Sequence, residues 1–82
     1  MKARKVYDKI LAGSRNVRFE DLCQLAEAFG FRRDRISGSH HIYRHQLGLM
    51  LNLQPDRKRH AKFYQVRQLL ALVEENGLGL KD

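Results

Sequence analysis

The spacing of the apolar residues changes twice along this chain, and the change limits the folds that the chain can adopt. Apolar side chains recur at helical spacing over residues 3–12 and 19–29, which predicts two amphipathic helices. After Gly30 the helical spacing is lost, and LGLMLNLQ alternates strictly, as a half-buried β-strand does. Helical spacing returns from Phe63 onward. The sequence therefore predicts helices on both sides of a central β-region.

The central region predicts three short antiparallel strands. Gly38 and Ser39 separate FRRDRIS from HHIYRHQ, and Pro55 ends the third segment, LGLMLNLQ. The predicted element order is α-α-β-β-β-α, an α+β fold. Because Leu51 and Leu53 need an apolar layer above them, the helices should cover one face of the sheet and leave the other face polar.

The second predicted strand is rich in histidine, since three of the four histidines lie within residues 40–45. Strand alternation places on one side His40, Ile42 and Arg44, and on the other His41, Tyr43 and His45. We expect Ile42 to face the core. We expect His40, at the first position of the strand, to be half sheltered at the rim of the sheet. Such an imidazole, near guanidinium groups, can stay neutral and accept a proton at physiological pH.

Length and cysteine content indicate one small domain, residues 1–82, in a reducing compartment. Cys23 is the only cysteine, so the chain cannot form an intrachain disulfide or a Cys-based zinc site. Cys23 is predicted to be a small core residue. No apolar run approaches the length of a membrane span, and the first residues carry charges where a signal peptide needs a hydrophobic stretch. We expect a cytoplasmic protein with no membrane partner and no cofactor.

Positive charge is concentrated in the middle of the chain. The formal net charge is +7, and residues 31–67 contain nine Lys and Arg against two Asp. This basic belt predicts a polyanionic partner, of which nucleic acid is the commonest, although a charged face that only maintains solubility remains an alternative. The belt comprises Arg32, Arg33, Arg35, Arg44, Arg57, Lys58, Arg59, Lys62 and Arg67.

Several chemistries could use the histidine strand. A zinc site would need partners for His41 and His45 that the nearby sequence does not supply, so we expect no metal. Ser39 as a nucleophile lacks an evident orienting group. RNA carries its own nucleophile in the 2′-OH, so its cleavage needs a base and cations that stabilise charge on phosphorus. From the residues alone, packing or simple phosphate contacts are favoured over catalysis, and aromatic side chains such as Tyr43 could stack on bases.

The predicted helix over residues 19–29, the strand that contains Arg35 and the G-S-H element follow a pattern. In this pattern the chain resembles the HicA mRNA-interferase toxins, also called the YcfA-like family. The resemblance spans roughly residues 18–77 and leaves residues 1–17 as an N-terminal helical extension. It rests on the pattern F-x-D-L-x-x-L-x-x-x-x-G-F, on an Arg and on G-S-H. The matching residues are Phe19, Asp21, Leu22, Leu25, Gly30, Phe31, Arg35, Gly38, Ser39 and His40.

This resemblance implies a fold, an activity and a partner. The fold would be similar to a double-stranded-RNA-binding domain, with a three-stranded antiparallel sheet and helices on one face. The activity would be metal-independent cleavage of mRNA, with His40 as the catalytic residue and a HicB-like antitoxin as inhibitor. We expect RNA contacts from Gly38, Ser39, Arg35, Arg44, Arg57, Lys58, Arg59, Lys62 and Arg67. Auxiliary candidates are His41, His45 and Tyr43.

Two alternatives remain from the residues themselves. A module that binds double-stranded RNA without cutting it would use the same basic belt to contact phosphates and 2′-OH groups. A DNA-binding accessory protein would need a helix rich in base-reading side chains, and the final helix offers Gln65, Arg67 and Gln68 only. The extra residues before residue 18 and the charged loop around residues 57–60 depart from the compact family pattern.

Overall fold

The computed structural model describes residues 2–81, and these form three helices and three strands in the predicted order. The α+β fold with the order α-α-β-β-β-α is confirmed, and the helix boundaries fall within two residues of the predicted ones. The elements are α1 (Lys2–Leu11), α2 (Phe19–Ala28), β1 (Arg32–Ser37), β2 (His40–Arg44), β3 (Met50–Leu53) and α3 (Phe63–Asn76).

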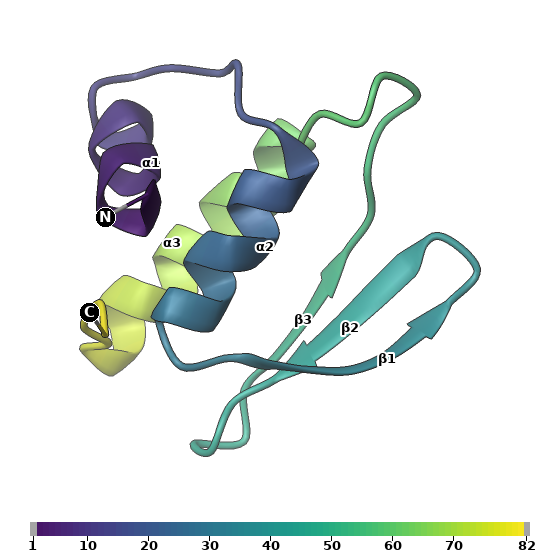
Figure 1. Ribbon diagram of the computed structural model, residues 1–82. Helices are drawn as coiled ribbons and strands as arrows, with labels where there is room; N and C mark the ends of the chain where they lie inside the picture. Colours follow the sequence, from purple (N-terminus) through teal and green to yellow (C-terminus); the bar gives the residue numbers. More distant parts are fainter. Residues whose placement is uncertain (1, 82) are drawn as a thin grey trace.

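The helices and the sheet form layers. Helices α2 and α3 lie against one face of the antiparallel sheet, whose strand order is β1-β2-β3, and α1 packs on α2 at a distance from the sheet (Figure 1). The rings of Tyr7 in α1 and Phe29 after α2 meet edge to face with their centroids 5.2 Å apart. Within residues 2–81, no helix lies over the opposite face of the sheet, as the resemblance to an RNA-binding fold implied.

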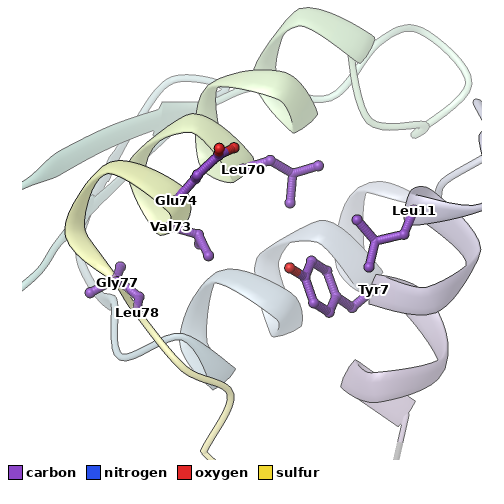
Figure 2. A pocket seen from close by; sticks show the side chains of 7 residues that line it. All are labelled: Tyr7, Leu11, Leu70, Val73, Glu74, Gly77 and Leu78. Carbon is purple, nitrogen blue, oxygen red and sulfur yellow. The ribbon is translucent and has the colours of Figure 1, made fainter.

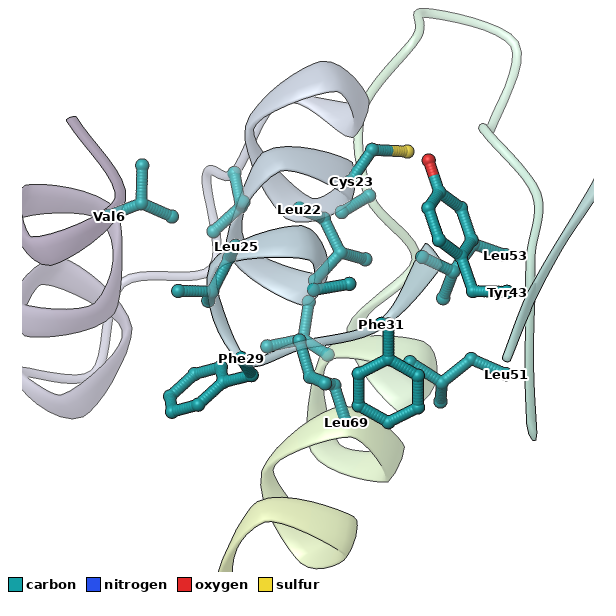
Figure 3. Packing of buried hydrophobic residues seen from close by; sticks show 14 of the residues in the cluster. Val6, Leu22, Cys23, Leu25, Phe29, Phe31, Tyr43, Leu51, Leu53 and Leu69 are labelled. Carbon is teal, nitrogen blue, oxygen red and sulfur yellow. The ribbon is translucent and has the colours of Figure 1, made fainter. Parts of the chain in front are cut away.

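The core lies between the sheet and the two covering helices and continues between α2 and α1, which contributes Ala3, Val6 and Ile10 (Figure 3). Tyr43 retains 2% of its accessible surface, and Leu51 and Leu53 of β3 are buried with it. Ile42 instead pairs with Asn52 on the open face and is only half-buried. The prediction that Ile42 faces the core is wrong, although the division of the strand into two sides is right. The register of β2 on β3, which sets Tyr43 opposite Leu51, decides which side is buried.

The β1–β2 hairpin carries the Gly-Ser pair at its tip and projects beyond the helices (Figure 1). Ser37 pairs with His40 across the turn, and Gly38 has φ +60°, which only glycine adopts at low cost. A positive φ at the first central residue is typical of a type II′ hairpin turn. Near the other end of β1 the register shifts at Asp34, which marks a β-bulge.

Glycines stand at the ends of α2 and α3, and each has a structural reason. A Cβ at Gly30, just after α2, would lie 2.9 Å from His45 Nε2, so the absence of a side chain lets the end of β2 approach the helix. Gly77 ends α3 in the left-handed conformation that commonly caps a helix. Within residues 2–81, each helix is too short or too polar to cross a bilayer.

Candidate nucleic-acid interface

His40 opens β2 directly after the glycine turn, and its side chain lies on the open face of the sheet. The ring is exposed, so the expectation of a half-sheltered site is wrong; the hairpin tip extends past the covering helices. His40 Nδ1 lies 3.0 Å from Asn52 Oδ1, which belongs to β3. Asn52 was not singled out in the sequence, although its place between Leu51 and Leu53 puts it on this same face.

A second set of polar side chains links the hairpin turn to the start of α3. Gln54 Nε2 donates to Ser39 Oγ at 2.8 Å, and Lys62 Nζ donates to Gln54 Oε1 at 3.3 Å. The structure therefore links Lys62, from a distant part of the sequence, to the Gly-Ser turn through Gln54. The sequence did not single out Gln54 either, because no residue pattern marks a contact between the Gly-Ser turn and the segment after β3.

His41 lies on the opposite side of β2, toward the helices. Its ring meets Phe19 edge to face at 4.9 Å, and its Nδ1–H donates to the Ser39 carbonyl oxygen at 3.2 Å. It borders a pocket of about 210 Å³. The lining residues are Phe19, Glu20, Cys23, Glu27, Arg33, His41, Tyr43 and Arg59. His40 and His41 thus lie on opposite faces of the sheet, although they are neighbours in the sequence.

Charged groups in this pocket pair with one another. Arg59 Nη2 lies 2.9 Å from Glu20 Oε1. A backbone hydrogen bond to the Glu20 carboxylate and the hydrogen bond from Arg59 hold the pKa of Glu20 below its ordinary value of 4.5. Arg59 also stacks over Phe19, at 5.6 Å from the ring centroid. Arg59 is therefore engaged on the helix side of the sheet, away from the open face that carries His40.

Tyr43 and Cys23 form the buried wall of the same pocket (Figure 3). Burial raises the pKa of both groups above their ordinary values of 10.0 and 9.0. Because the Tyr43 ring is packed in the core, it is not available to stack on a base, and that interpretation is wrong. Cys23 is buried in the core, as predicted.

His45 follows β2 and lies at the end remote from His40. Its ring meets Phe31 edge to face at 5.1 Å, and its Nδ1 accepts a hydrogen bond from the Leu47 backbone N–H at 3.1 Å. The ring also lies against Gly30. The three clustered histidines therefore do not form one group: one lies on the open face, one borders the pocket, and one packs at the base of the hairpin.

The charged loop before α3 is held by backbone pairing and a capping carboxylate. Phe19 N donates to the Arg59 carbonyl, and Ala61 N donates to the Val17 carbonyl. Asp56 Oδ1 accepts from the backbone N–H groups of Lys58 and His60 at 2.8 Å each. These bonds, that from His60 foremost, lower the pKa of Asp56 below 3.8. Arg57 and Lys58 are left exposed at the loop tip.

The remaining cations of the basic belt differ in their availability. Arg35 pairs with Ile42, so it lies on the open face with His40. Arg44 lies further along that face and is engaged by Asp34, with its Nε 3.1 Å from Oδ2. Arg67 of α3 stands 5.9 Å from the ring centroid of Phe63. Arg35 and Lys62 are thus the belt cations that the structure gathers around the G-S-H turn.

Two further features of residues 2–81 bear on ligands. This part of the chain contains no cluster of three or more His, Cys, Asp or Glu side chains arranged to hold a metal ion. A larger, mostly apolar groove of about 470 Å³ lies between α1 and α3 (Figure 2). It is lined by Tyr7, Leu11, Leu70, Val73, Glu74, Gly77 and Leu78, none of which belongs to the histidine hairpin.

Comparison with known proteins identifies a family for most of the chain. Residues 19–74 match the model of the family described as the HicA toxin of bacterial toxin-antitoxin. The match begins with α2, includes the whole sheet and ends within α3, so α1 lies outside it. No curated protein and no solved structure matches the chain significantly.

Proposed function

The chain belongs to the HicA toxin family, whose members are toxins of bacterial toxin-antitoxin systems. On this basis we propose that it is a metal-independent endoribonuclease that cleaves mRNA. His40 acts as the general base or acid. The observation that supports this role best is that the exposed imidazole stands at the hairpin tip, beside Ser39 and within the part of the belt that includes Arg35 and Lys62. A HicB-like antitoxin is the proposed inhibitor.

The reaction requires little more than this set of groups. His40 removes the proton of a ribose 2′-OH, and the resulting oxygen attacks the adjacent phosphorus. The bond from phosphorus to the 5′-oxygen breaks, that oxygen receives a proton, and the products carry a 2′,3′-cyclic phosphate and a 5′-hydroxyl. Arg35 and Lys62 stabilise the charge that develops on the phosphate oxygens. Ser39 donates to the phosphate, and Gly38, which has open space around its Cα, lets the backbone approach it closely.

Other belt residues are proposed to bind RNA without taking part in the chemistry. Arg57 and Lys58 at the loop tip, Arg44 on the open face and Arg67 on α3 are exposed and can contact phosphates along the chain of the substrate. Arg59 and the auxiliary histidines His41 and His45 contact protein partners away from the open face, on the helix side of the sheet or at the base of the hairpin. We therefore assign to these three a supporting role at most.

The test is cleavage of single-stranded RNA by the purified protein in the presence of EDTA. Wild type should cut, and His40→Ala should reduce the rate by roughly 10²- to 10⁴-fold, the usual effect of losing an acid–base group. Circular dichroism should show that the variant is folded, since His40 is exposed. Intact RNA with wild-type protein, or products that end in a 3′-hydroxyl, would contradict the proposal.

The alternative is a module that binds double-stranded RNA without cutting it. Wild type and His40→Ala also distinguish this alternative from the ribonuclease. In that case a duplex would be bound intact, and His40→Ala would bind it as wild type does. The edge strand β1, exposed at every position and carrying three of the belt arginines, is the feature that favours binding to a polyanion of either kind.

A further inference from the structure

We infer that Asn52 is a positioning residue for His40: its side-chain oxygen holds a proton on His40 Nδ1 and leaves Nε2 as the atom that exchanges a proton with RNA. The inference rests on the proposed ribonuclease function and adds to it a residue and a specific nitrogen atom. It comes from the tertiary contact alone, because the two residues are 12 positions apart in the sequence.

The pairing of β2 with β3 brings the two side chains together. Asn52 is the register partner of Ile42, so it lies diagonally across from His40 on the same open face. His40 Nδ1 and Asn52 Oδ1 are 3.0 Å apart, an ordinary hydrogen-bond distance. An amide oxygen accepts and cannot donate, so the imidazole Nδ1–H is the donor. In the neutral ring Nε2 then carries a lone pair, which is what a general base needs.

The other two histidines of the hairpin region do not present an unprotonated Nε2 on the open face. His45 Nδ1 accepts from the Leu47 N–H, so the neutral His45 ring carries its proton on Nε2. His41 Nδ1–H donates to the Ser39 carbonyl oxygen, but this ring is half-buried on the helix side. His40 is therefore the exposed ring of this set that presents an unprotonated Nε2 on the open face.

Asn52 is suited to this role because its side chain does nothing for the core. It is exposed and lies between the buried Leu51 and Leu53, so its loss leaves the packing unchanged. Without the amide oxygen, the His40 ring can rotate and place its proton on either nitrogen. Cleavage should then slow by about 3- to 10-fold, the effect expected from one net hydrogen bond.

The decisive measurement is made on the free protein without RNA. Long-range ¹H–¹⁵N correlation NMR reports which ring nitrogen carries the proton, and His40→Gln identifies the His40 signals. In wild type we expect a protonated Nδ1 and an unprotonated Nε2 for His40, the reverse of the pattern of His45. Asn52→Leu should move the His40 proton toward Nε2, whereas Asn52→Asp, which keeps an acceptor in place, should retain the wild-type pattern.

Met50→Leu is the matched control. Met50 lies on the same strand and face as Asn52, is 56% exposed and pairs with Arg44 rather than with the hairpin tip. This substitution should change neither the His40 tautomer nor the rate of RNA cleavage. A loss of activity shared by Met50→Leu and Asn52→Leu would point to a general disturbance of the sheet and would overturn the specific role of Asn52.

The outcomes separate this inference from the proposed function. If the His40 proton stays on Nδ1 in Asn52→Leu, or is already on Nε2 in wild type, Asn52 does not position the ring and the inference is overturned, whatever the activity. If the tautomer shifts as expected but wild type leaves RNA intact, the positioning stands and the ribonuclease proposal fails. A tautomer shift accompanied by slower cleavage at unchanged KM supports both.

Discussion

Tyr43 and Leu51 face each other across the β2–β3 ladder, and both are buried beneath the helices. The neighbouring pair, Ile42 and Asn52, lies on the open side of the same ladder. This register sends an aromatic side chain into the core and leaves an aliphatic one half-exposed. It also fixes the open face as the side that carries His40.

Because the register buries Tyr43 but not Ile42, truncation to alanine should lower the free energy of unfolding more at Tyr43 than at Ile42. Tyr43→Ala removes a ring from the core and should lower the free energy of unfolding by about 3–5 kcal/mol. Ile42→Ala removes a half-buried side chain and should cost about 1 kcal/mol. Urea unfolding followed by circular dichroism measures both, and a Tyr43→Ala chain that is already unfolded without urea also agrees. A larger loss for Ile42→Ala would contradict this assignment of the two faces.

Because the Tyr43 phenol is buried, we also expect the folded protein to lose stability at alkaline pH. Burial raises the pKa of Tyr43 above its ordinary value of 10.0, so the folded state holds the proton more tightly than the unfolded chain does. The resulting stabilisation is complete below pH 10 and is lost as the pH rises above it. Tyr43→Phe should therefore show a shallower fall in urea midpoint above pH 10 than wild type.

Cys23 provides the reference for that comparison. Its thiol, whose ordinary pKa of 9.0 is also raised by burial, contributes a decline that begins at lower pH and is present in both proteins. Identical pH profiles of wild type and Tyr43→Phe above pH 10 would show that the phenol does not resist ionisation in the fold.

Charge reversal in the basic belt should slow association with the antitoxin. The belt provides nine cations, so an acidic inhibitor surface would be drawn to the face around His40 by electrostatic steering. Arg33→Glu and Arg57→Glu should lower the association rate constant and weaken its dependence on salt. His40→Ala should slow cleavage by roughly 10²- to 10⁴-fold yet largely preserve binding of the antitoxin. Stopped-flow or surface plasmon resonance measurements at several salt concentrations provide these rates.

Lys9→Glu is the control for this prediction. It produces the same change in net charge on α1, which lies on the far side of α2 from the sheet (Figure 1). Its association rate should stay closer to that of wild type than the rates of the belt variants. If RNA were still cleaved by the complex, the inhibitor would have to bind elsewhere and act at a distance.

Much of the fold follows from local patterns. Helical spacing located α2 and α3, because three or four residues per repeat specify which side chains share a helix face. Gly38 located the hairpin turn, because a positive φ suits glycine best. The G-S-H element marked His40 without any structure. The neighbours of the G-S-H element could not be found in this way, because Asn52 reaches His40 only through strand pairing, and Lys62 reaches the Gly-Ser turn only through Gln54 and the path of the loop before α3.

The sequence by itself determined the elements, their order, the alternation of side chains along β2 and the concentration of positive charge, since each depends on residues close together in the chain. The tertiary structure alone decided which side of β2 is buried, because one face of a strand becomes the core only when the register on β3 and the helices above it are set. That decision separates His40 from His41. It places the His40 ring beside Asn52 and the Gly-Ser turn near Lys62, and it directs His41 to the pocket beneath α2.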